Sequence, residues 1–431
     1  MIAGKSANEI FDSIRQHITS GKLAKGETLP SVRELAALLG VNRNTVASAY
    51  KRLVISGLAQ SLGRNGTVVK EALRPVALEG GCPHTPLADL SSGNPAADRL
   101  PDLNHYLSHI NRTPRLYGDA PVSPSLQHWA RDWMQEAMPA AGEIDLTSGA
   151  IDAIERLLCA HLLPGDSVAV EDPCFLSSIS MLRYSGFNAS SVTIDSEGMQ
   201  PEMLEQALSK GARAVILTPR AHNPTGYSLS EARAAALRQV ISRYPQVLVI
   251  VDDHFALLSS QTWYPVIPPQ TLHWAVVRSM SKTLGPDIRL AFVASDSATS
   301  AKLRLRLNSG SQWVSHLLQD LAYACLTDEN YQQALAQTRR FYASQQQQMA
   351  QALHTQGVDA VIPGDGLNLW LPLTTASHTT AFALAKLGWL VREGEAFGVS
   401  EAAHGLRITL STLNDTDITQ LAADIKRALN P

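Results

Sequence analysis

The chain has 431 residues, which is too long for one ordinary hydrophobic core and indicates two or more domains. Its composition, 45% hydrophobic and 17% charged, is typical of a globular protein. No apolar run approaches the about 20 residues of a membrane-spanning helix, and the first residues lack the apolar core of a signal peptide. We therefore expect a cytoplasmic protein without membrane contact.

The cysteines also indicate a cytoplasmic protein, because they form no CxxC pair and stand far apart in the sequence. We expect free thiols in a reducing compartment, with neither a disulfide framework nor a metal site. The four residues are Cys82, Cys159, Cys174 and Cys325.

The net charge of −3 hides an asymmetry between the two ends of the chain. Residues 1–70 hold ten Lys/Arg and four Asp/Glu, a charge of +6, and the remainder carries −9. A basic segment on an acidic body suggests that the segment meets a polyanion. Charge alone leaves open the alternative of a merely solvated basic surface.

The first seventy residues predict three short helices. The first begins at Ser6, with Glu9 three residues on, and the second begins at Ser31, with Glu34 at the same spacing. Both pairs have the pattern of a capping box. Asn42 is a good N-cap for the third helix, whose buried face is predicted to be Val46, Ala49, Tyr50 and Leu53. Leu35, Leu38 and Leu39 are expected to face inward from the second helix.

After these helices, LAQSLGRNGTVV places two β-prone runs around Asn65-Gly66, a strong hairpin signal. Helices followed by a hairpin predict a winged helix-turn-helix, in which the third helix enters the major groove of DNA. Its N-terminal polar residues would then meet the base edges, and residues on the second helix and the wing would reach the backbone or the minor groove. The candidate base and backbone contacts are Arg33, Arg43, Asn44, Thr45, Ser48, Arg64 and Thr67.

Over nearly all of residues 1–70 the sequence resembles the GntR family of regulators. The resemblance is carried by LPSVRELAALLGVNRNTVASAYKRLVISGLA followed by GRNGTVV. It implies operator binding as a homodimer, with phosphate contacts from Arg33 and Arg52 and a wing contact from Arg64.

Residues 71–92 contain prolines and paired glycines without periodicity, which predicts a linker or an extended arm. From residue 93 to residue 431, β-rich runs such as AVILTP and VLVIVDD alternate with amphipathic stretches. This alternation predicts an α/β domain with a mainly parallel sheet, which binds ligands at the carboxyl ends of its strands.

The predicted strand ends carry a consistent chemistry. Gly149 precedes a helix whose free N–H groups suit a phosphate, and Ser279, Ser281 and Arg289 offer further phosphate donors. Lys282 could form a Schiff base with an aldehyde, and Asp252 could hold a pyridine nitrogen protonated. Asn223 could donate to a phenolic oxygen. Each residue alone has an ordinary structural explanation, but together they predict a site for pyridoxal 5′-phosphate (PLP).

Residues 93–431 resemble the fold-type-I PLP-dependent transferases, the aspartate aminotransferase superfamily, with a small C-terminal α/β subdomain at about 320–431. The resemblance implies that Lys282 holds PLP, that Asp252 and Asn223 contact its ring, that Phe175 stacks on the ring, and that Tyr117 reaches the phosphate of the neighbouring subunit. It also implies that Arg407 clamps a ligand carboxylate. The implied phosphate site is Gly149, Ala150, Ser279, Ser281 and Arg289.

Two positions depart from the superfamily pattern. His254 follows the aspartates where many relatives have a tyrosine, so it either replaces that contact or leaves it unmade, and Ile151 stands where relatives often have glutamine. We therefore expect PLP binding with at most residual transamination.

The whole chain resembles the MocR subfamily of GntR regulators, which implies DNA binding controlled by PLP or a small amine. The resemblance indicates genes of vitamin B6 salvage, pyridoxal kinase among them, as the target. Two alternatives stay open: an active aminotransferase that carries a DNA-binding domain, and a scaffold that has lost PLP and senses another ligand.

Overall fold

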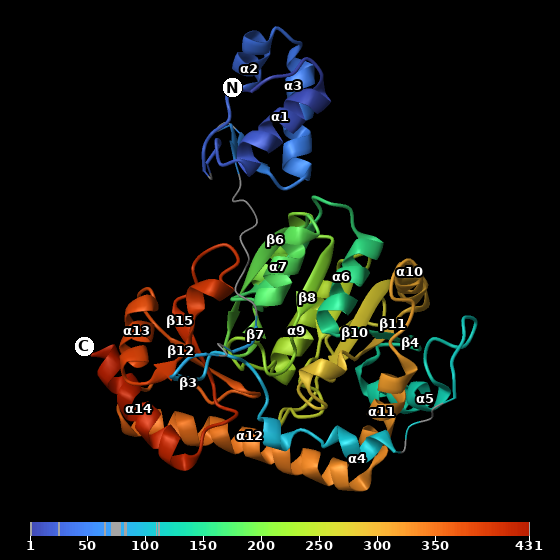
Figure 1. The fold of residues 1–431 in the computed structure, drawn as a ribbon, viewed down its shortest axis with the longest axis vertical. Helices are drawn as coiled ribbons and strands as arrows, with labels where there is room; N and C mark the ends of the chain where they lie inside the picture. Colours follow the sequence, from blue (N-terminus) through green and yellow to red (C-terminus); the bar gives the residue numbers. More distant parts are fainter. Residues whose placement is uncertain are drawn as a thin grey trace. The chain divides into compact units, whose positions relative to one another are not determined.

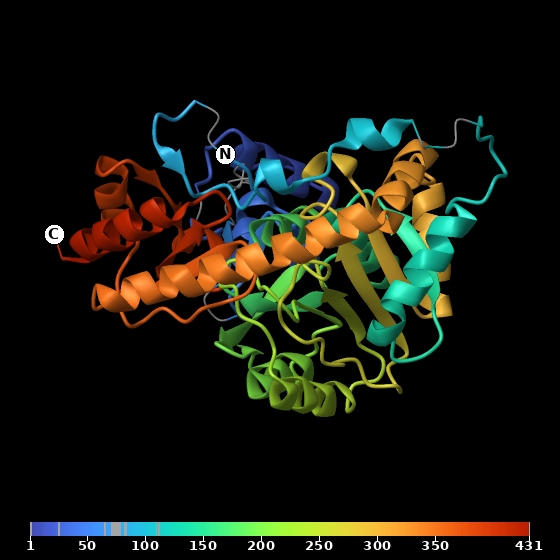
Figure 2. The same cartoon turned by 90° about the horizontal axis from the view of Figure 1, so that it is seen from below.

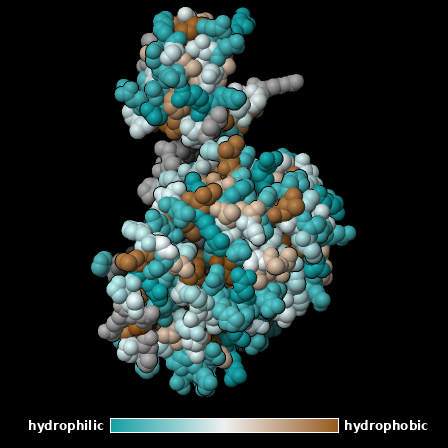
Figure 3. All heavy atoms as spheres, turned by 90° about the vertical axis from the view of Figure 1, so that its right-hand side faces the viewer, coloured by the Kyte–Doolittle hydropathy of each residue, from teal (hydrophilic) through white to brown (hydrophobic). Residues whose placement is uncertain are grey.

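The computed structural model describes residues 2–24, 26–63, 66–69, 79–81, 84–108, 110 and 113–430. The chain divides into two compact units: one holds the N-terminal head with two short segments, 162–167 and 180–188, and the other holds the rest of the body (Figure 1). Among the described residues, no helix combines the length and the apolar character needed to cross a membrane. The face of the protein in Figure 3 is largely hydrophilic, with hydrophobic side chains scattered over it in small groups.

The head is a winged helix-turn-helix, as the sequence predicts. Its elements are α1 (Ala7–Thr19), α2 (Val32–Leu39), α3 (Arg43–Ile55), β1 (Ala59–Ser61) and β2 (Thr67–Val69). The two strands pair antiparallel, Ser61 opposite Thr67, and form the wing. The expected hairpin residue Asn65 lies outside the described residues, so the chemistry of the turn stays a prediction.

The core of the head joins all three helices. Ile10, Leu35, Val46 and Leu53 are fully buried there. The expectation for Leu38 was wrong, because 66% of this residue is exposed to solvent. Its place in the eight-residue α2 turns it away from the stripe formed by Leu35 and Ala36.

The caps of the head helices follow the sequence closely. Ser31 and Glu34 form the predicted capping box, and Gly40 ends α2 with a φ of 62°, in the left-handed region. Asn42 caps α3 by accepting a hydrogen bond from the backbone N–H of Asn44. Ser6 caps α1 as predicted. The Glu9 carboxylate, however, accepts a hydrogen bond from the backbone N–H of Lys5, whereas a capping box requires that of Ser6.

The body is built on an eight-stranded sheet of order β4-β11-β10-β9-β8-β5-β6-β7 (Figure 1). Strands β5, β8, β9 and β10 are parallel, whereas β11 is antiparallel to both β10 and β4, so β4 has the same direction as the parallel strands. The strands are β4 (Glu143–Thr147), β5 (Ser167–Asp172), β6 (Asn188–Asp195), β7 (Gly198–Met199), β8 (Ala214–Leu217), β9 (Leu248–Asp252), β10 (His273–Ser279) and β11 (Ala291–Ser295).

Helices cover both faces of this sheet, which explains why its central strands are apolar throughout. In β9, Val249 and Val251 pack into the core on one face, while Ile250 is buried on the other. The helices are α4 (Leu103–Leu107), α5 (Pro124–Met134), α6 (Ala150–His161), α7 (Leu176–Tyr184), α8 (Pro201–Ser209), α9 (Glu231–Ile241), α10 (Ser297–Asn308) and α11 (His316–Thr327), with short 3₁₀ turns at Ala97–Arg99, Gln135–Ala137, Pro286–Ile288 and Gly394–Phe397.

The C-terminal part forms a smaller α/β layer with its own core. The long helix α12 (Glu329–Thr355) runs beneath the body toward this layer (Figure 2). A three-stranded sheet of order β12-β15-β14 packs with two helices. The elements are β12 (Asn368–Pro372), α13 (His378–Lys386), β13 (Trp389–Leu390), β14 (Arg392–Glu393), β15 (Gly405–Thr409) and α14 (Asp415–Leu429).

Part of the segment predicted as a linker, 71–92, is folded onto this layer instead. Strand β3 (Ala88–Asp89) pairs parallel with β13, and Leu90 is buried in the C-terminal core. The sequence did not predict this strand, because two paired residues form no periodic pattern and the prolines and glycines nearby indicate a loop. Residues 70–78, 82 and 83 lie outside the described residues.

Candidate functional site

The predicted site residues meet at one edge of the large sheet. The five strands that share a direction, β4, β5, β8, β9 and β10, end at this edge. Gly149 comes two residues after β4, whereas Asp252 and Ser279 are the last residues of β9 and β10. Arg289 lies just before β11, whose opposite direction brings its start to the same edge.

Lys282 lies at this edge, and its Nζ donates a hydrogen bond to the backbone oxygen of Gly93 at 2.5 Å. Burial lowers the pKa of Lys282 to about 8; the Glu79 carboxylate opposes this shift and the Arg407 charge adds to it. Burial and the nearby Lys282 charge lower the pKa of His254 to about 4. At pH 7 about a tenth of the Lys282 amine is therefore neutral, far more than for a lysine with an ordinary pKa, and the neutral amine is the nucleophilic form.

The adjacent aspartates at the end of β9 have different surroundings. Asp253 is fully buried and paired with two arginines, Arg220 (Nη2 to Oδ2, 2.7 Å) and Arg278 (Nε to Oδ2, 2.9 Å). Asp252 is 8% exposed, and its buried Oδ1 has no hydrogen-bond partner among the described residues. Burial and the Asp253 charge raise the pKa of Asp252 to about 7. Asp252 is thus the aspartate with an open acceptor.

The turn between β4 and α6 forms a cradle that only glycine fits. Gly149 has a φ of 103°, and a Cβ at this position would lie 2.5 Å from Nη2 of Arg289. That same Nη2 donates to the backbone oxygen of Ser148 at 2.6 Å. Ala150 begins α6, so the free N–H groups of its first turn open here, a favourable place for an anion.

The two serines complete this side of the site. The Ser279 hydroxyl donates to the Ser281 Oγ at 3.0 Å and accepts from the Ser281 backbone N–H at 3.2 Å. The sequence-predicted phosphate residues therefore converge from two strands and a helix start.

Arg407 is fully buried on β15. Its Nη1 donates to the Asn223 Oδ1 at 3.0 Å, which joins the predicted ring contact to the predicted carboxylate clamp. The Arg407 guanidinium also pairs with Glu79, through Nη2 to Oε2 at 2.8 Å and through Nη1 to Oε1. Glu79 lies in the segment predicted as a linker, and nothing in the sequence near it indicates this contact.

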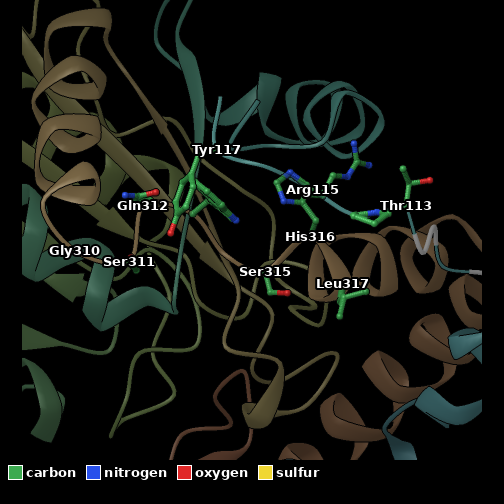
Figure 4. A pocket seen from close by; sticks show the side chains of 11 residues that line it. Thr113, Arg115, Tyr117, Gly310, Ser311, Gln312, Ser315, His316 and Leu317 are labelled. Carbon is green, nitrogen blue, oxygen red and sulfur yellow. The ribbon is translucent and has the colours of Figure 1, made fainter. Parts of the chain in front are cut away.

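The two predicted aromatic contacts differ in exposure. Phe175, between β5 and α7, is half-buried. Tyr117 is 86% exposed, with its ring 5.7 Å from that of Trp313. Tyr117 lines a surface pocket of about 660 Å³ together with residues 310–313 and 315–317 (Figure 4). The Tyr117 side chain is thus open to solvent in a single chain, and its contact with a neighbouring subunit stays a prediction.

Two buried polar residues behind the site were missed by sequence reasoning. Both Glu171 carboxylate oxygens accept from the Thr218 backbone N–H at 3.1 Å, and His222 Nε2 lies 3.4 Å from Glu171. Burial raises the pKa of Glu171 to about 8, and burial lowers the pKa of His222 to about 3. The available signal was the position of Glu171 near the end of β5 and of His222 in the loop that follows β8.

In the head, the predicted DNA-contacting residues are mostly at the surface. Arg33, Arg43, Asn44 and Ser48 are exposed, whereas Thr45 and Thr67 are half-buried. Arg64 lies outside the described residues.

Arg52, predicted to contact a phosphate, is exposed but packs within the head. Its guanidinium lies 4.7 Å from the centre of the Phe11 ring, and its Nη1 hydrogen-bonds the Asn8 Oδ1. These contacts orient Arg52 on the α1 side of α3.

Comparison with known proteins agrees with this two-part organisation. Residues 85–425 match the family "Aminotransferase class I and II", and residues 6–69 match "Bacterial regulatory proteins, gntR family". The chain is 73% identical, over the full length of both chains, to the vitamin B6 salvage pathway transcriptional repressor PtsJ of Salmonella typhimurium. It is 26% identical to the HTH-type transcriptional regulator TauR of Rhodobacter capsulatus, covering 99% of this chain and 97% of the relative.

Solved structures show the same fold for the body. The kynurenine aminotransferase of Pyrococcus horikoshii superimposes with a TM-score of 0.70 at 22% identity, covering 81% of this chain and 93% of that one. An archaeal alanine:glyoxylate aminotransferase gives a TM-score of 0.71 at 20% identity, covering 80% and 91%. The chain belongs to the aminotransferase class I and II family and, through its N-terminal domain, to the GntR transcriptional regulators of MocR-like architecture.

Proposed function

We propose that this protein is a PLP-dependent transcriptional regulator, in which a dimer of heads binds operator DNA and occupancy of the body by PLP changes that binding. One observation carries the proposal: the Oδ1 of Asp252, which has no hydrogen-bond partner in the described part of the chain, lies at the same sheet edge as the Lys282 amine and the Gly149–Arg289 cradle. A buried acceptor without a donor is costly unless a ligand supplies one.

The residues at this edge offer a partner for each reactive or charged group of PLP. PLP supplies an aldehyde, a pyridine nitrogen and a phosphate in one molecule. The Lys282 amine, with its pKa lowered to about 8, would hold the aldehyde, and Asp252 would accept a hydrogen bond from the protonated ring nitrogen. The phosphate would bind the α6 N-terminus, with Gly149, Ala150, Ser279, Ser281 and Arg289 as its contacts.

The remaining proposed contacts surround the ring and the second subunit. Asn223 would donate to the phenolic oxygen, with His254 beside it, and Phe175 would lie against the ring. Tyr117 would reach the phosphate of the partner in a homodimer. The exposure of Tyr117 supports this role, since a tyrosine serving another subunit is not buried in its own.

For the DNA, we propose that Arg43, Asn44, Thr45 and Ser48 contact base edges from the start of α3. Arg33, Arg52, Arg64 and Thr67 would contact the backbone and the minor groove. The 73% identity to a vitamin B6 salvage repressor supports genes of that pathway as the target and repression as the outcome.

The test is capture of PLP at one lysine. Purified protein is titrated with PLP, its absorbance spectrum is recorded, and the complex is reduced with borohydride before mass spectrometry. The wild-type protein should gain the mass of one phosphopyridoxyl group on Lys282. Lys282→Ala should gain none, and the exposed control Lys210→Ala should behave as wild type. A wild-type spectrum and mass unchanged by PLP would refute the proposal.

An active aminotransferase is the second candidate, and the buried Arg407 favours it because a guanidinium next to Asn223 suits a ligand α-carboxylate. The two functions differ in one measurement. Rapid conversion of bound PLP to pyridoxamine phosphate by a common amino acid would identify an enzyme, whereas slow conversion accords with a regulator.

A further inference from the structure

The carboxylate-binding side of the site is already filled by a side chain of the protein. The Glu79 carboxylate meets both terminal nitrogens of Arg407 in a two-pronged ion pair, and the Asn223 Nδ2 donates to the Glu79 Oε1 at 3.1 Å. Arg407 is fully buried and the Glu79 side chain is 22% exposed. This is the geometry in which a guanidinium holds the carboxylate of a bound ligand.

The segment that follows Glu79 engages both cationic groups of the site. Arg407 Nη2 donates to the backbone oxygen of Ser91 at 2.6 Å, and Lys282 Nζ donates to that of Gly93 at 2.5 Å. A Cβ on Gly93 would lie 3.0 Å from the Glu79 Oε2, so the segment folds tightly back on itself. Glu79, Ser91 and Gly93 thus occupy the two groups that a carboxylate-bearing amine would use.

The charges in the site favour this arrangement. Burial by itself would raise the pKa of Glu79, but the hydrogen bonds and charge of Arg407, with the Lys282 charge, hold that pKa below its usual value. The carboxylate is therefore ionised at neutral pH and compensates a buried guanidinium that would otherwise be costly. Without Glu79, Arg407 would need another anion.

We propose that Glu79 is a built-in occupant of the carboxylate subsite, and that an α-amino acid must displace it, together with the backbone contacts of Ser91 and Gly93, in order to bind. The inference rests on the proposed function for the PLP site and adds the class of ligand that moves the segment. An amine without a carboxylate has no need of Arg407 and leaves Glu79 in place.

The position of Glu79 in the chain gives this displacement a consequence. Glu79 stands ten residues after Val69, the last residue of the wing strand β2. Release of Glu79 from Arg407 shifts the first anchored position of the body farther from the wing along the sequence. Because the spacing of two DNA half-sites is geometrically strict, such a release alters how two heads reach an operator.

A tethered carboxylate competes at an effective concentration in the millimolar range, so its removal raises the apparent affinity of a competing ligand by about 10- to 100-fold. The first experiment compares Glu79→Gln, which keeps the shape and removes the charge, with the exposed control Glu202→Gln. Each PLP-loaded protein is titrated with L-alanine and with ethylamine, which differ by one carboxylate, and the change in the spectrum of bound PLP gives the affinity.

Glu79→Gln should bind L-alanine at least about tenfold more tightly than wild type, while ethylamine binds both proteins alike. Glu202→Gln should match wild type for both ligands. Equal L-alanine affinity in wild type and Glu79→Gln overturns the proposal, as does an equal gain for ethylamine, since that would reflect a general opening of the site.

A second experiment needs no PLP and therefore separates this proposal from the proposed function. Hydrogen–deuterium exchange is measured on cofactor-free protein over residues 79–93, where the Gly93 N–H donates to the Thr409 Oγ1 at 2.9 Å and the Gly80 N–H donates to the Ser92 oxygen at 3.1 Å. Exchange in this segment should be faster in Glu79→Gln than in wild type and Glu202→Gln. Unchanged exchange would show that Glu79 does not hold the segment.

Discussion

At the scale of single residues, the adjacent aspartates Asp252 and Asp253 have different roles because their hydrogen-bond partners differ. Asp253 faces two buried arginines, whereas no described residue donates a hydrogen bond to the Oδ1 of Asp252. The sequence DDHF predicted that one aspartate meets a ring nitrogen, and strand position selected Asp252. It could not predict the arginine partners of Asp253, since Arg220 and Arg278 lie on different strand ends and meet only in the fold.

These surroundings predict opposite outcomes for the two conservative replacements. Asp253→Asn removes the buried carboxylate shared by Arg220 and Arg278. Among the described residues Arg278 then keeps only the exposed Glu136 as an anionic partner, so the change should cost about 3–5 kcal/mol of unfolding free energy. Asp252→Asn should leave the cofactor-free protein folded and weaken PLP binding, because the ring nitrogen loses its anionic partner. Thermal melts and PLP titrations of both variants make the comparison, and equal destabilisation by the two would contradict it.

The pKa of Asp252 also predicts a pH dependence. Folding raises this pKa from 3.8 to about 7, so the folded state holds the proton more tightly and its advantage is lost as the pH rises between these values. Without PLP, Asp252→Asn should remove this loss, a gain over wild type of at most about 4 kcal/mol at pH 8. Melting temperatures at pH 5 and pH 8 test it; a wild-type slope unchanged in the variant would contradict the assignment. Folding also raises the pKa of Glu171, to about 8, so part of the loss of stability with rising pH remains in both wild type and Asp252→Asn.

At the scale of elements, the turn between β4 and α6 is the most constrained part of the site. Gly149→Ala places a methyl group 2.5 Å from the Arg289 guanidinium at a φ of 103°. We expect the Arg289 side chain to be displaced and PLP to bind at least tenfold more weakly, a change of about 1.4 kcal/mol or more. PLP titration measures this, with Gly165→Ala as a control for the positive φ alone, since its Cβ would meet nothing within 4 Å.

Helix α3 carries the prediction for the DNA. Arg43→Ala removes an exposed cation at the start of this helix and should weaken binding to promoter DNA by about 1–3 kcal/mol. Arg15→Ala, which removes a cation ion-paired with Asp12 on α1, should change binding much less. Binding assays at one fixed salt concentration compare the two; equal losses would place the DNA on another face of the head.

Local signals in the sequence predicted the helices and strands better than they predicted which side chains these elements bury. The caps at Ser31 and Asn42 and the strands before Asn223 and Asp252 are formed as expected, because each depends on a few adjacent residues. Leu38 was expected inside and is exposed, since an eight-residue helix buries only a narrow stripe.

At the scale of the whole molecule, the sequence predicted both domains and the edge at which the site residues meet. It could not predict that the Glu79 carboxylate lies on Arg407, because the two residues are 328 positions apart and the segment around Glu79 has no periodic pattern. The contact depends on how strand β15 and the end of the predicted linker pack in the C-terminal layer, which no local pattern encodes.

The central claim is that occupancy of the body changes the affinity of the head for DNA. The most direct measurement is the affinity of wild type and Lys282→Ala for the promoter region upstream of the gene, each with and without PLP at one salt concentration. We predict that PLP shifts the wild-type affinity by about tenfold or more, within the usual 1–3 kcal/mol of allosteric coupling, and leaves Lys282→Ala unchanged. The same wild-type affinity with and without PLP would contradict the account.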